Sequence, residues 1–382
     1  MKKLVLSTLS LALFATAGAA HAQNSVTLYG LLDTGLTYTS NAHGSSNFQQ
    51  ASGILNGNRW GLRGSEDLGN GLKAIFTLES GFNLSNGNMG QNSRLFGRQA
   101  FVGLASNQYG AVTLGRQYDN LVDNLGPLSL NGTQYGGTLA SHPYDNDNLN
   151  NSFRVSNSVK YQSIDYAGFK LGAMYGFSNQ ADGFANNRAY SVGATYAFGG
   201  LKVAAAYLQL NGGGASSNTS GAVSTDTTFT ASRQRTYGAG VSYAFGPANV
   251  GFVFTQTQLA NATAISQSAS GSTSSSGFTL NGAGAHFTNF ELNGRYAITP
   301  AWSLSGAYTY TEASLQGVDP KYHQLTLQSD YALSKRTDVY AEAAYQHVGS
   351  TGSSGITAHI VGVSASSTDS QVVGTVGIRH RF

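Results

Sequence analysis

Apolar and polar residues alternate with a period of two along most of this chain. In the stretch "VTLYGLLDTGLTY", Val26, Leu28 and Leu36 share one parity, whereas Thr27 and Asp33 share the other. Successive side chains of a β-strand point to opposite faces, so this pattern predicts a strand with one apolar face. The same alternation recurs in "LKAIFTLESGF", "FKLGAMYGF", "RTYGAGVSYAF" and "TDVYAEAAY".

Sixteen such segments can be counted along the sequence. Their approximate centres are Leu32, Leu62, Phe76, Val102, Val112, Val159, Ala173, Ala194, Ala205, Val241, Phe252, Leu292, Leu304, Leu327, Ala341 and Val376. Most segments are longer than the roughly 9–11 residues that a tilted strand needs to cross a bilayer. The fold class is therefore predicted to be all-β, with sixteen membrane-crossing strands.

The connections between these segments alternate between short and long. Short turns include "DLGNG", "SNQYG" and "SKRTD", and long connections rich in Gly, Ser, Asn and Thr include residues 211–232 and 260–285. Outer-membrane barrels have tight periplasmic turns and long external loops. A barrel in lipid must also close, because an open sheet edge would leave backbone groups unpaired. The pattern thus predicts a closed antiparallel transmembrane β-barrel.

Four of the predicted strands end in Tyr-Ala just before a short turn. The tyrosines are Tyr196, Tyr243, Tyr296 and Tyr331, and each lies on the apolar parity of its strand. Repeated around a barrel, such rings would form a belt at the periplasmic boundary of the membrane, with the ring in lipid and the hydroxyl in water. Tyr is also favoured in the strands of soluble proteins, so a soluble secreted β-protein is kept as an alternative.

The first 22 residues have the features of a secretory signal peptide. Lys2 and Lys3 precede a short apolar run, and Ala20-His21-Ala22 forms a small-x-small cleavage site. The apolar run is too short for a spanning helix. We expect cleavage after Ala22, which leaves residues 23–382 as one barrel domain beyond the inner membrane.

Composition agrees with a membrane barrel and excludes several other classes. Charged residues make up only 10% of the chain, against roughly 25% in soluble domains. There is no Cys, so neither disulfides nor thiol chemistry are expected. The formal net charge of +3 falls to +1 without Lys2 and Lys3, because 21 basic residues become 19 against 18 acidic ones. A nearly neutral chain is not expected to bind nucleic acid.

Several motifs give the chain a family resemblance. "SVTLYGLLDTGLTY", "NRWGLRGSEDLGNGLKAIFTLESGF", "LFGRQAFVGL" and "YGAVTLGRQYD", together with Phe382, resemble the Gram-negative general diffusion porins of the Burkholderia, Bordetella and Neisseria type. The resemblance covers essentially all of residues 23–382. It implies a sixteen-stranded barrel that forms a homotrimer in the outer membrane, with the third external loop folded into the pore.

The same resemblance implies partners beyond the other subunits. A terminal aromatic such as Phe382 resembles the signal that the outer-membrane assembly machinery reads, so Phe382 is the expected assembly signal. Outer-membrane lipid and lipopolysaccharide would surround the barrel. Small hydrophilic solutes and ions would pass through it.

The third external loop would run from about Tyr118 to Ser152, the longest stretch between alternating segments. Loops beyond about 12–15 residues with no structure of their own are usually functional or disordered. Many general porins carry a Pro-Glu-Phe-Gly-Gly motif in this loop. This chain has only Gly126-Pro127 and Tyr135-Gly136-Gly137 there, so the usual acidic residue of the constriction has no counterpart.

Charged residues are expected to line the pore. Alternation directs four basic residues into the lumen, and it places Val155 and Val159 on the opposite, lipid-facing parity; the four are Arg59, Arg63, Arg154 and Lys160. The resemblance adds Arg98 and Arg116, which correspond to constriction-zone arginines. Both share their parity with apolar neighbours, so a bulge or a strand end must re-aim them. The acids that would face these basic residues from the third loop are Asp119, Asp123, Asp145 and Asp147.

Opposed rows of charge across a water-filled passage would orient dipolar solutes and set ion preference. Arg suits such a wall because it stays charged at any relevant pH. We therefore expect a passive general diffusion channel with size exclusion at the third loop, no cofactor and no enzymatic activity. One alternative is a substrate-specific channel, in which Tyr29 and Tyr135 could line the path. Another is an outer-membrane hydrolase that uses a histidine such as His142 or His323.

No metal site is predicted, and the third loop is interpreted as having a polar tip near Asp145, with a bound Ca²⁺ there kept as an alternative. The stretch "DNDNLNN" at residues 145–151 is similar to the start of a calcium loop, but it lacks the Gly at position six and the Glu at position twelve that such a loop requires. The histidines are scattered, and no pair has the spacing of zinc ligands.

Overall fold

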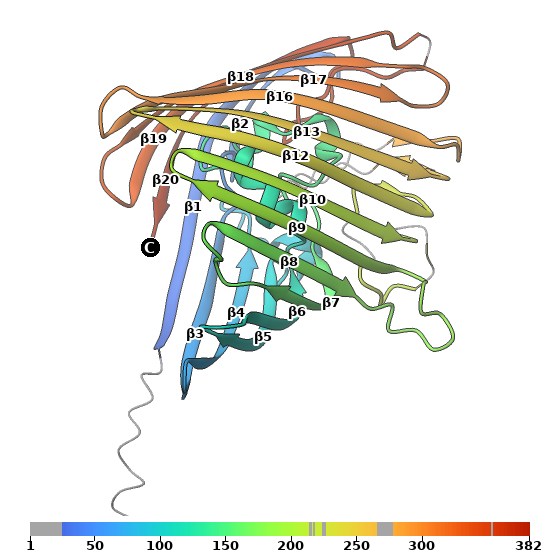
Figure 1. Ribbon diagram of the computed structural model, residues 1–382. Coiled ribbons are helices and arrows are strands. Elements are labelled where there is room, and N and C mark those ends of the chain that lie inside the picture. The colour runs from blue at the N-terminus through green and yellow to red at the C-terminus, as the bar shows by residue number, and fades with distance from the viewer. Residues whose placement is uncertain (1–24, 214–215, 217, 224–226, 266–277, 353) are drawn as a thin grey trace, which may run out of the picture.

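The strands of the chain wind into a barrel (Figure 1). The computed structural model describes residues 25–213, 216, 218–223, 227–265, 278–352 and 354–382. The predicted signal peptide at residues 1–22 lies outside this range, as do parts of the connections at 211–232 and 260–285. Among the described residues, no helix is long and apolar enough to cross a membrane.

The first half of the wall is built from strands of 8 to 18 residues. They are β1 (Ser25–Ala42), β2 (Ser45–Ser52), β3 (Arg59–Gly69), β4 (Leu72–Gly81), β5 (Gln99–Ser106), β6 (Gly110–Gln117), β7 (Val155–Gln162), β8 (Phe169–Gly176) and β9 (Arg188–Phe198). A short turn of helix, α2 (Gly90–Ser93), lies between β4 and β5.

The second half of the wall has longer and more regular strands. They are β10 (Leu201–Asn211), β12 (Arg233–Phe245), β13 (Ala248–Ala260), β16 (Ala285–Ala297), β17 (Trp302–Ser314), β18 (Lys321–Ala332), β19 (Thr337–Gly349) and β20 (Ser370–Arg381). Three two-residue strands from the long connections form a separate small sheet: β11 (Phe229–Thr230), β14 (Ala264–Ile265) and β15 (Phe278–Thr279).

The barrel closes where the first and last strands pair. β1 lies antiparallel to β20, with Leu36 opposite Val376. The seam continues through two backbone hydrogen bonds between Gly30 and Phe382, with N···O distances of 3.0 and 3.1 Å. In Figure 1 the blue β1 and the red β20 run side by side.

On its other side, β1 pairs with β3 along its first half and with β2 along its second half. β2 and β3 therefore form one interrupted wall strand, and the described wall is a closed antiparallel barrel of sixteen strands. Each of the sixteen predicted strand centres falls in a different one of these strands. The predicted fold class is confirmed.

The prediction that connection length alternates strictly is wrong in two places. β1 is joined to β2, the first part of the second wall strand, by residues 43–44 only. β17 and β18 are joined by residues 315–320 only, about as many as in the short connection between β7 and β8. The reason is that strand pairing continues past β17, through a bridge between Leu315 and Val318. Gln316 and Gly317 then reverse the chain with positive φ values of 53° and 81°. Successive connections nevertheless lie at opposite ends of the barrel.

The outer face of the wall is apolar and the inner face is mostly polar. Along β12, β17 and β18, exposed residues alternate strictly with buried ones over most of each strand. The four Tyr-Ala tyrosines are exposed by 41–52%, which agrees with the predicted belt beside the short turns.

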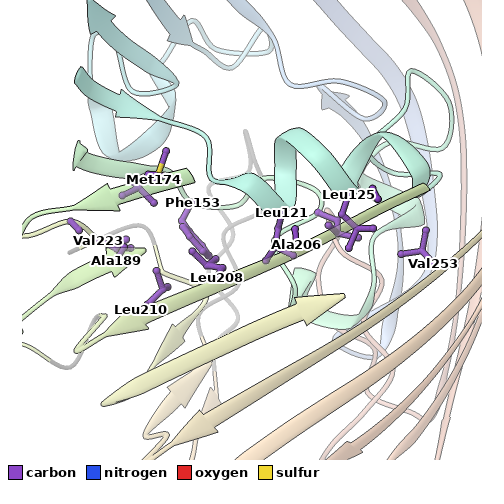
Figure 2. Close-up of a cluster of buried hydrophobic side chains, with 14 of the residues drawn as sticks. Leu121, Leu125, Phe153, Met174, Ala189, Ala206, Leu208, Leu210, Val223 and Val253 are labelled. Carbon is purple, nitrogen blue, oxygen red and sulfur yellow. The ribbon is translucent and has the colours of Figure 1, made fainter. Parts of the chain in front are cut away.

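The connection between β6 and β7 lies inside the barrel. It contains η1 (Leu121–Leu125), η2 (Gly126–Leu128), η3 (Thr138–Ala140) and η4 (Pro143–Asp145), and Figure 1 shows these helical turns within the ring of strands. We call residues 118–154 the inner segment. Leu121 and Leu125 are fully buried, and Figure 2 shows them beside Ala206 and Leu208 of β10.

The inner face of the wall is adapted to this packing. β10 turns the apolar side chains of Ala204, Ala206 and Leu208 inward, where lumenal strands of an open channel would be polar. A Cβ atom at Gly193 would lie 2.5 Å from the Asn124 side chain, so glycine there allows the inner segment to approach the wall closely. This apolar patch fixes one end of the inner segment.

Candidate functional site

Three of the predicted arginines line one cavity beside the inner segment. Arg59 comes from the start of β3, Arg98 directly precedes β5, and Arg154 directly precedes β7. Strand pairing of β3, β4, β5, β6 and β7 therefore brings the three together. The cavity has a volume of about 190 Å³ and is also lined by Tyr118 and by amide side chains that include Asn56, Asn131 and Asn150. No Asp or Glu is among the described residues that line it.

Arg98 has a close acidic partner. Its Nε lies 2.7 Å from Oε1 of Glu79, an inward residue of β4. The Tyr118 hydroxyl donates to the same Glu79 oxygen at 3.0 Å, and the Tyr29 hydroxyl donates to the other oxygen at 2.9 Å. Glu79 was not among the predicted site residues, although its inward parity in "LKAIFTLESGF" pointed to the lumen.

Arg59 and Arg154 are held differently. Arg59 forms no ion pair, since no carboxylate oxygen of a described Asp or Glu lies within 4 Å of its guanidinium nitrogens. The guanidinium carbon of Arg154 lies 5.5 Å from the centre of the Tyr118 ring, close enough for a cation–π contact. The lining of the cavity therefore carries more positive than negative charge.

Arg116 does not line the cavity, but its hydrogen bonds support the segments that do. The pairing of β6 with β7 shifts register between Gly115 and Gln117, and this is the kind of irregularity that the sequence required to re-aim the side chain. Arg116 donates to the carbonyl oxygen of Gly97 at 2.8 Å and to the Ser156 hydroxyl at 2.9 Å. It thus ties together the chain segments that carry Arg98 and Arg154.

Lys160 and Arg63 lie outside the cavity lining. The Lys160 ammonium pairs with Asp123 and donates to the carbonyl oxygen of Tyr118 at 2.8 Å. Arg63 is exposed on β3, with its guanidinium carbon 5.3 Å from the centre of the Tyr29 ring.

The lipid-facing parity predicted for Val155 is wrong. This side chain is fully buried with Phe153 and Leu121 inside the barrel. Alternation breaks nearby because Asn157 has a φ of 52°, a left-handed conformation that interrupts regular pleating. Val159, two residues beyond the break, is half-buried.

Three of the four predicted acids form bonds within the inner segment. Asp119 accepts from the Leu121 amide at 2.8 Å and from the Asn148 side chain at 2.7 Å. Asp145 accepts from the Asn150 amide at 2.9 Å and from the Ser152 hydroxyl at 2.6 Å. Burial raises the pKa of Asp119 to about 6 and the pKa of Asp145 to about 7. Neither carboxylate lines the arginine cavity.

Asp147 belongs to a buried charged cluster that docks the inner segment on the far wall. Its Oδ2 lies 2.6 Å from Nδ1 of His142, and the His142 Nε2 lies 2.9 Å from Oε2 of Glu291 on β16. All three side chains are fully buried. Burial alone would lower the pKa of His142, but the Asp147 and Glu291 carboxylates raise it to about 10. His142 is therefore a cation between two carboxylates.

Glu291 also receives hydrogen bonds from other parts of the inner segment. The Ser129 hydroxyl donates to it at 2.7 Å, and the Leu130 amide donates to it at 2.7 Å. Further along, the Gly136 amide donates to Gln328 of β18 at 2.8 Å. Sequence reasoning missed Glu291, although its inward parity in "FELNGRYAI" was visible, and considered His142 only as a possible hydrolase residue.

A family model described as "Gram-negative porin" matches residues 8–351. An outer membrane porin protein of Bordetella pertussis is 43% identical over 236 residues, which cover 55% of this chain and 60% of that protein. Outer membrane porin protein 32 of Delftia acidovorans is 35% identical over 184 residues, covering 47% and 51%. The match thus spans between half and two thirds of the length of these relatives.

Solved structures resemble the whole barrel. An anion-selective porin from Comamonas acidovorans superposes with a TM-score of 0.72 at 25% identity, covering 94% of this chain and 100% of that one. OmpT of Vibrio cholerae in its trimer form superposes with a TM-score of 0.65 at 18% identity, covering 94% and 99%. The second likeness shows the shared fold alone.

Proposed function

Since this chain belongs to the Gram-negative porin family, we propose that it is a general diffusion channel for small hydrophilic solutes and ions. It is an outer-membrane β-barrel and not an enzyme. The observation that carries the proposal is the cavity beside the inner segment, lined by three arginines and by amides. A polar, charged lining suits water-filled passage and not the storage of an apolar ligand.

The inner segment would act as the size filter. Its leucines are anchored on β10, and its polar groups are anchored on Glu291 and Gln328. A segment fixed on two sides of the lumen narrows the barrel without relying on a mobile lid. Solutes too large for the remaining opening would be excluded.

The charge balance of the cavity favours anions. Arg59, Arg98 and Arg154 line it, whereas Glu79 compensates one of them, and rings of Arg are a known basis of anion selectivity. The similar barrel from Comamonas acidovorans is an anion-selective porin, which supports the same preference here. Because Arg does not lose its proton at relevant pH, the preference would not depend on pH.

The working unit would be a homotrimer. OmpT of Vibrio cholerae, which shares the fold, has been solved in a trimer form. Lipid of the outer membrane would contact the outer faces that remain exposed.

A planar bilayer under a salt gradient tests the proposal. The mature protein should give ohmic current in steps grouped by three, with a reversal potential of the sign expected for anion preference. Replacing Arg59, Arg98 and Arg154 with Gln should move the reversal potential toward cations. Folded protein without conductance would refute the channel, and an unchanged reversal potential in the triple variant would refute the role of these arginines.

A further inference from the structure

The connection between β19 and β20 folds into the barrel. We call residues 354–369 of this connection the cap segment. Four apolar side chains of the cap segment are at most 8% exposed: Ile356, Ala358, Ile360 and Val363. Removing apolar surface from water favours packing, so the cap segment is held against other parts of the barrel.

The cap segment packs on the inner segment. Ile360 shares an apolar cluster with Leu139 of η3. Gly362 lies so close to Thr138 that a Cβ atom at Gly362 would be 2.8 Å from the Thr138 Cγ2 atom. Thr138 also lines the arginine cavity. The cap segment therefore lies against the part of the inner segment that borders the proposed path of solutes.

A row of glutamines connects the two segments through the wall. The backbone N–H of His359 donates to Gln346 of β19 at 2.6 Å, and the Gln346 amide donates to Gln324 of β18 at 2.8 Å. Gln324 in turn donates to the carbonyl oxygens of Leu139 and Ser141 at 3.1 and 3.0 Å. His359 and the inner segment thus belong to one hydrogen-bond network.

His359 is the one titratable side chain that the cap segment buries. It is 5% exposed, and its ring packs edge-on against the Tyr144 ring with 6.1 Å between the centres. Its Nε2 lies 2.8 Å from the carbonyl oxygen of Val363, which can only accept, so Nε2 carries the proton of the neutral ring. Its Nδ1 is buried and has no hydrogen-bond partner among the described residues. The site accommodates a neutral ring and offers no acceptor to a proton on Nδ1.

No described acid forms an ion pair with His359. From the inner segment it meets Tyr144, whose hydroxyl lies 3.2 Å from that of Tyr322 on β18. The adjoining side chains of β19 and β20 are uncharged amides, and Asp369 of the cap segment is exposed. Burial lowers the pKa of His359 from an ordinary 6.5 to about 4, and the like charge of His43, in the turn between β1 and β2, acts in the same direction.

We propose that protonation of His359 releases the cap segment from the inner segment, so that acid widens the external opening of the pore. The proposal rests on the proposed channel function, because the cap segment would regulate the same pore. A buried imidazolium without an acceptor or an opposite charge is costly, whereas water would solvate it in a released segment. Because the pKa of His359 is lowered, its neutral ring stabilises the packed state fully above about pH 6.5, and this stabilisation is lost as pH falls through about 4.

Hydrogen exchange of the backbone amides of residues 356–363 measures the release directly, without any need for conductance. After correction for the intrinsic effect of pH, the opening constant of wild type should rise about 20-fold from pH 7 to pH 5. His359→Gln keeps a donor for the Val363 carbonyl but cannot become charged, so its opening constant should change by less than about threefold. The matched control His347→Gln removes a histidine whose side chain is 40% exposed, and it should keep the wild-type response.

Three exchange results would overturn the proposal. These are an equal rise in wild type and His359→Gln, no rise in wild type, and loss of the rise in His347→Gln. If the cap segment of His359→Gln is already unprotected at pH 7, His359→Met takes its place with the same expectations, because Met fills an apolar site and carries no charge.

Single-channel conductance of the same proteins tests whether the cap segment covers the path. Wild-type conductance, divided by the conductivity of the bulk solution, should rise from pH 7 to pH 5, whereas that of His359→Gln should not. Release without a rise in conductance would also overturn the proposal, because the cap segment would then not cover the path. Folded protein that gives no current at either pH would refute the channel and leave the exchange result interpretable.

Discussion

Arg59 and Asp147 lie within the same barrel interior but in different electrostatic surroundings. Arg59 lines an open cavity with no acid within ion-pair distance among the described residues. Asp147 is fully buried between His142 and Thr255, with its oxygen bonded to both at 2.6 Å. The electric field that acts on a solute in the lumen comes from charges that have no oppositely charged neighbour. In this cavity those charges are mainly the arginines. The acids, in contrast, hold the inner segment in place through their ion pairs and hydrogen bonds, and so support the surface that carries the arginines.

The largest effect is expected from removing the cation that lies between the buried acids. His142→Ala would leave Asp147 and Glu291 buried and without their shared partner. Breaking a buried ion pair from one side costs about 3–5 kcal/mol of the free energy of unfolding. Thermal unfolding should show this loss, or single-channel recordings should show a noisier and wider pore if only the inner segment detaches.

The matched control is Asp123→Asn. The partner of Asp123, Lys160, keeps its hydrogen bond to the Tyr118 carbonyl, and Asp123 is more exposed than the other predicted acids. Stability close to wild type is expected for this variant. Equal losses in the two variants would mean that the buried cluster has no special role.

Alkaline pH should weaken the same cluster without a mutation. The pKa of His142 is raised to about 10 from an ordinary 6.5, so its stabilising effect is complete below about pH 6.5 and is lost as pH rises through about 10. Melting temperature should therefore fall between pH 8 and pH 11. In Glu291→Gln the fall should begin at lower pH, because one carboxylate no longer holds the proton on His142. If the melting temperature falls identically in both proteins, titratable groups other than His142 are responsible for the fall.

Neutralising one cavity arginine should have a smaller but specific effect. A unit charge about 4 Å from the path of an ion is worth about 1 kcal/mol in water, which is about fivefold in relative permeability. Arg59→Gln should thus lower the anion-to-cation permeability ratio by roughly this factor, measured from the reversal potential. Stability should change little, since Arg59 has no ion pair to lose. An unchanged permeability ratio would mean that ions do not pass through the arginine cavity.

The wall of the barrel was predictable because side-chain parity is a local property. Whether Tyr243 or Leu304 faces outward depends on its immediate neighbours, and the period of two reports this directly. The same local rule directed Arg59 inward, and it indicated that Arg116 required an irregularity, which the register shift after Gly115 provides.

The position of the inner segment along the chain was predictable from the sequence, but its hydrogen-bond partners were not. The partners of Leu130 and Gly136 are Glu291 and Gln328, which lie more than 150 residues away in the sequence. They meet only after the barrel has closed, so no local pattern could pair them. The alternation also gave no warning at Val155, where one residue with positive φ, Asn157, breaks the parity.

The smallest effect is expected at Arg63, which the sequence placed beside Arg59 on the same parity. Arg63 is exposed and lies over the Tyr29 ring, outside the cavity lining. Water and salt screen an exposed charge beyond about 8–10 Å, so Arg63→Gln should change the reversal potential much less than Arg59→Gln. Both variants should be compared at low and at high salt, since screening should remove the small effect of Arg63 first. If Arg63→Gln shifts selectivity as much as Arg59→Gln, the narrow part of the path lies lower along β3, and selectivity arises from the whole row of inward arginines on that strand.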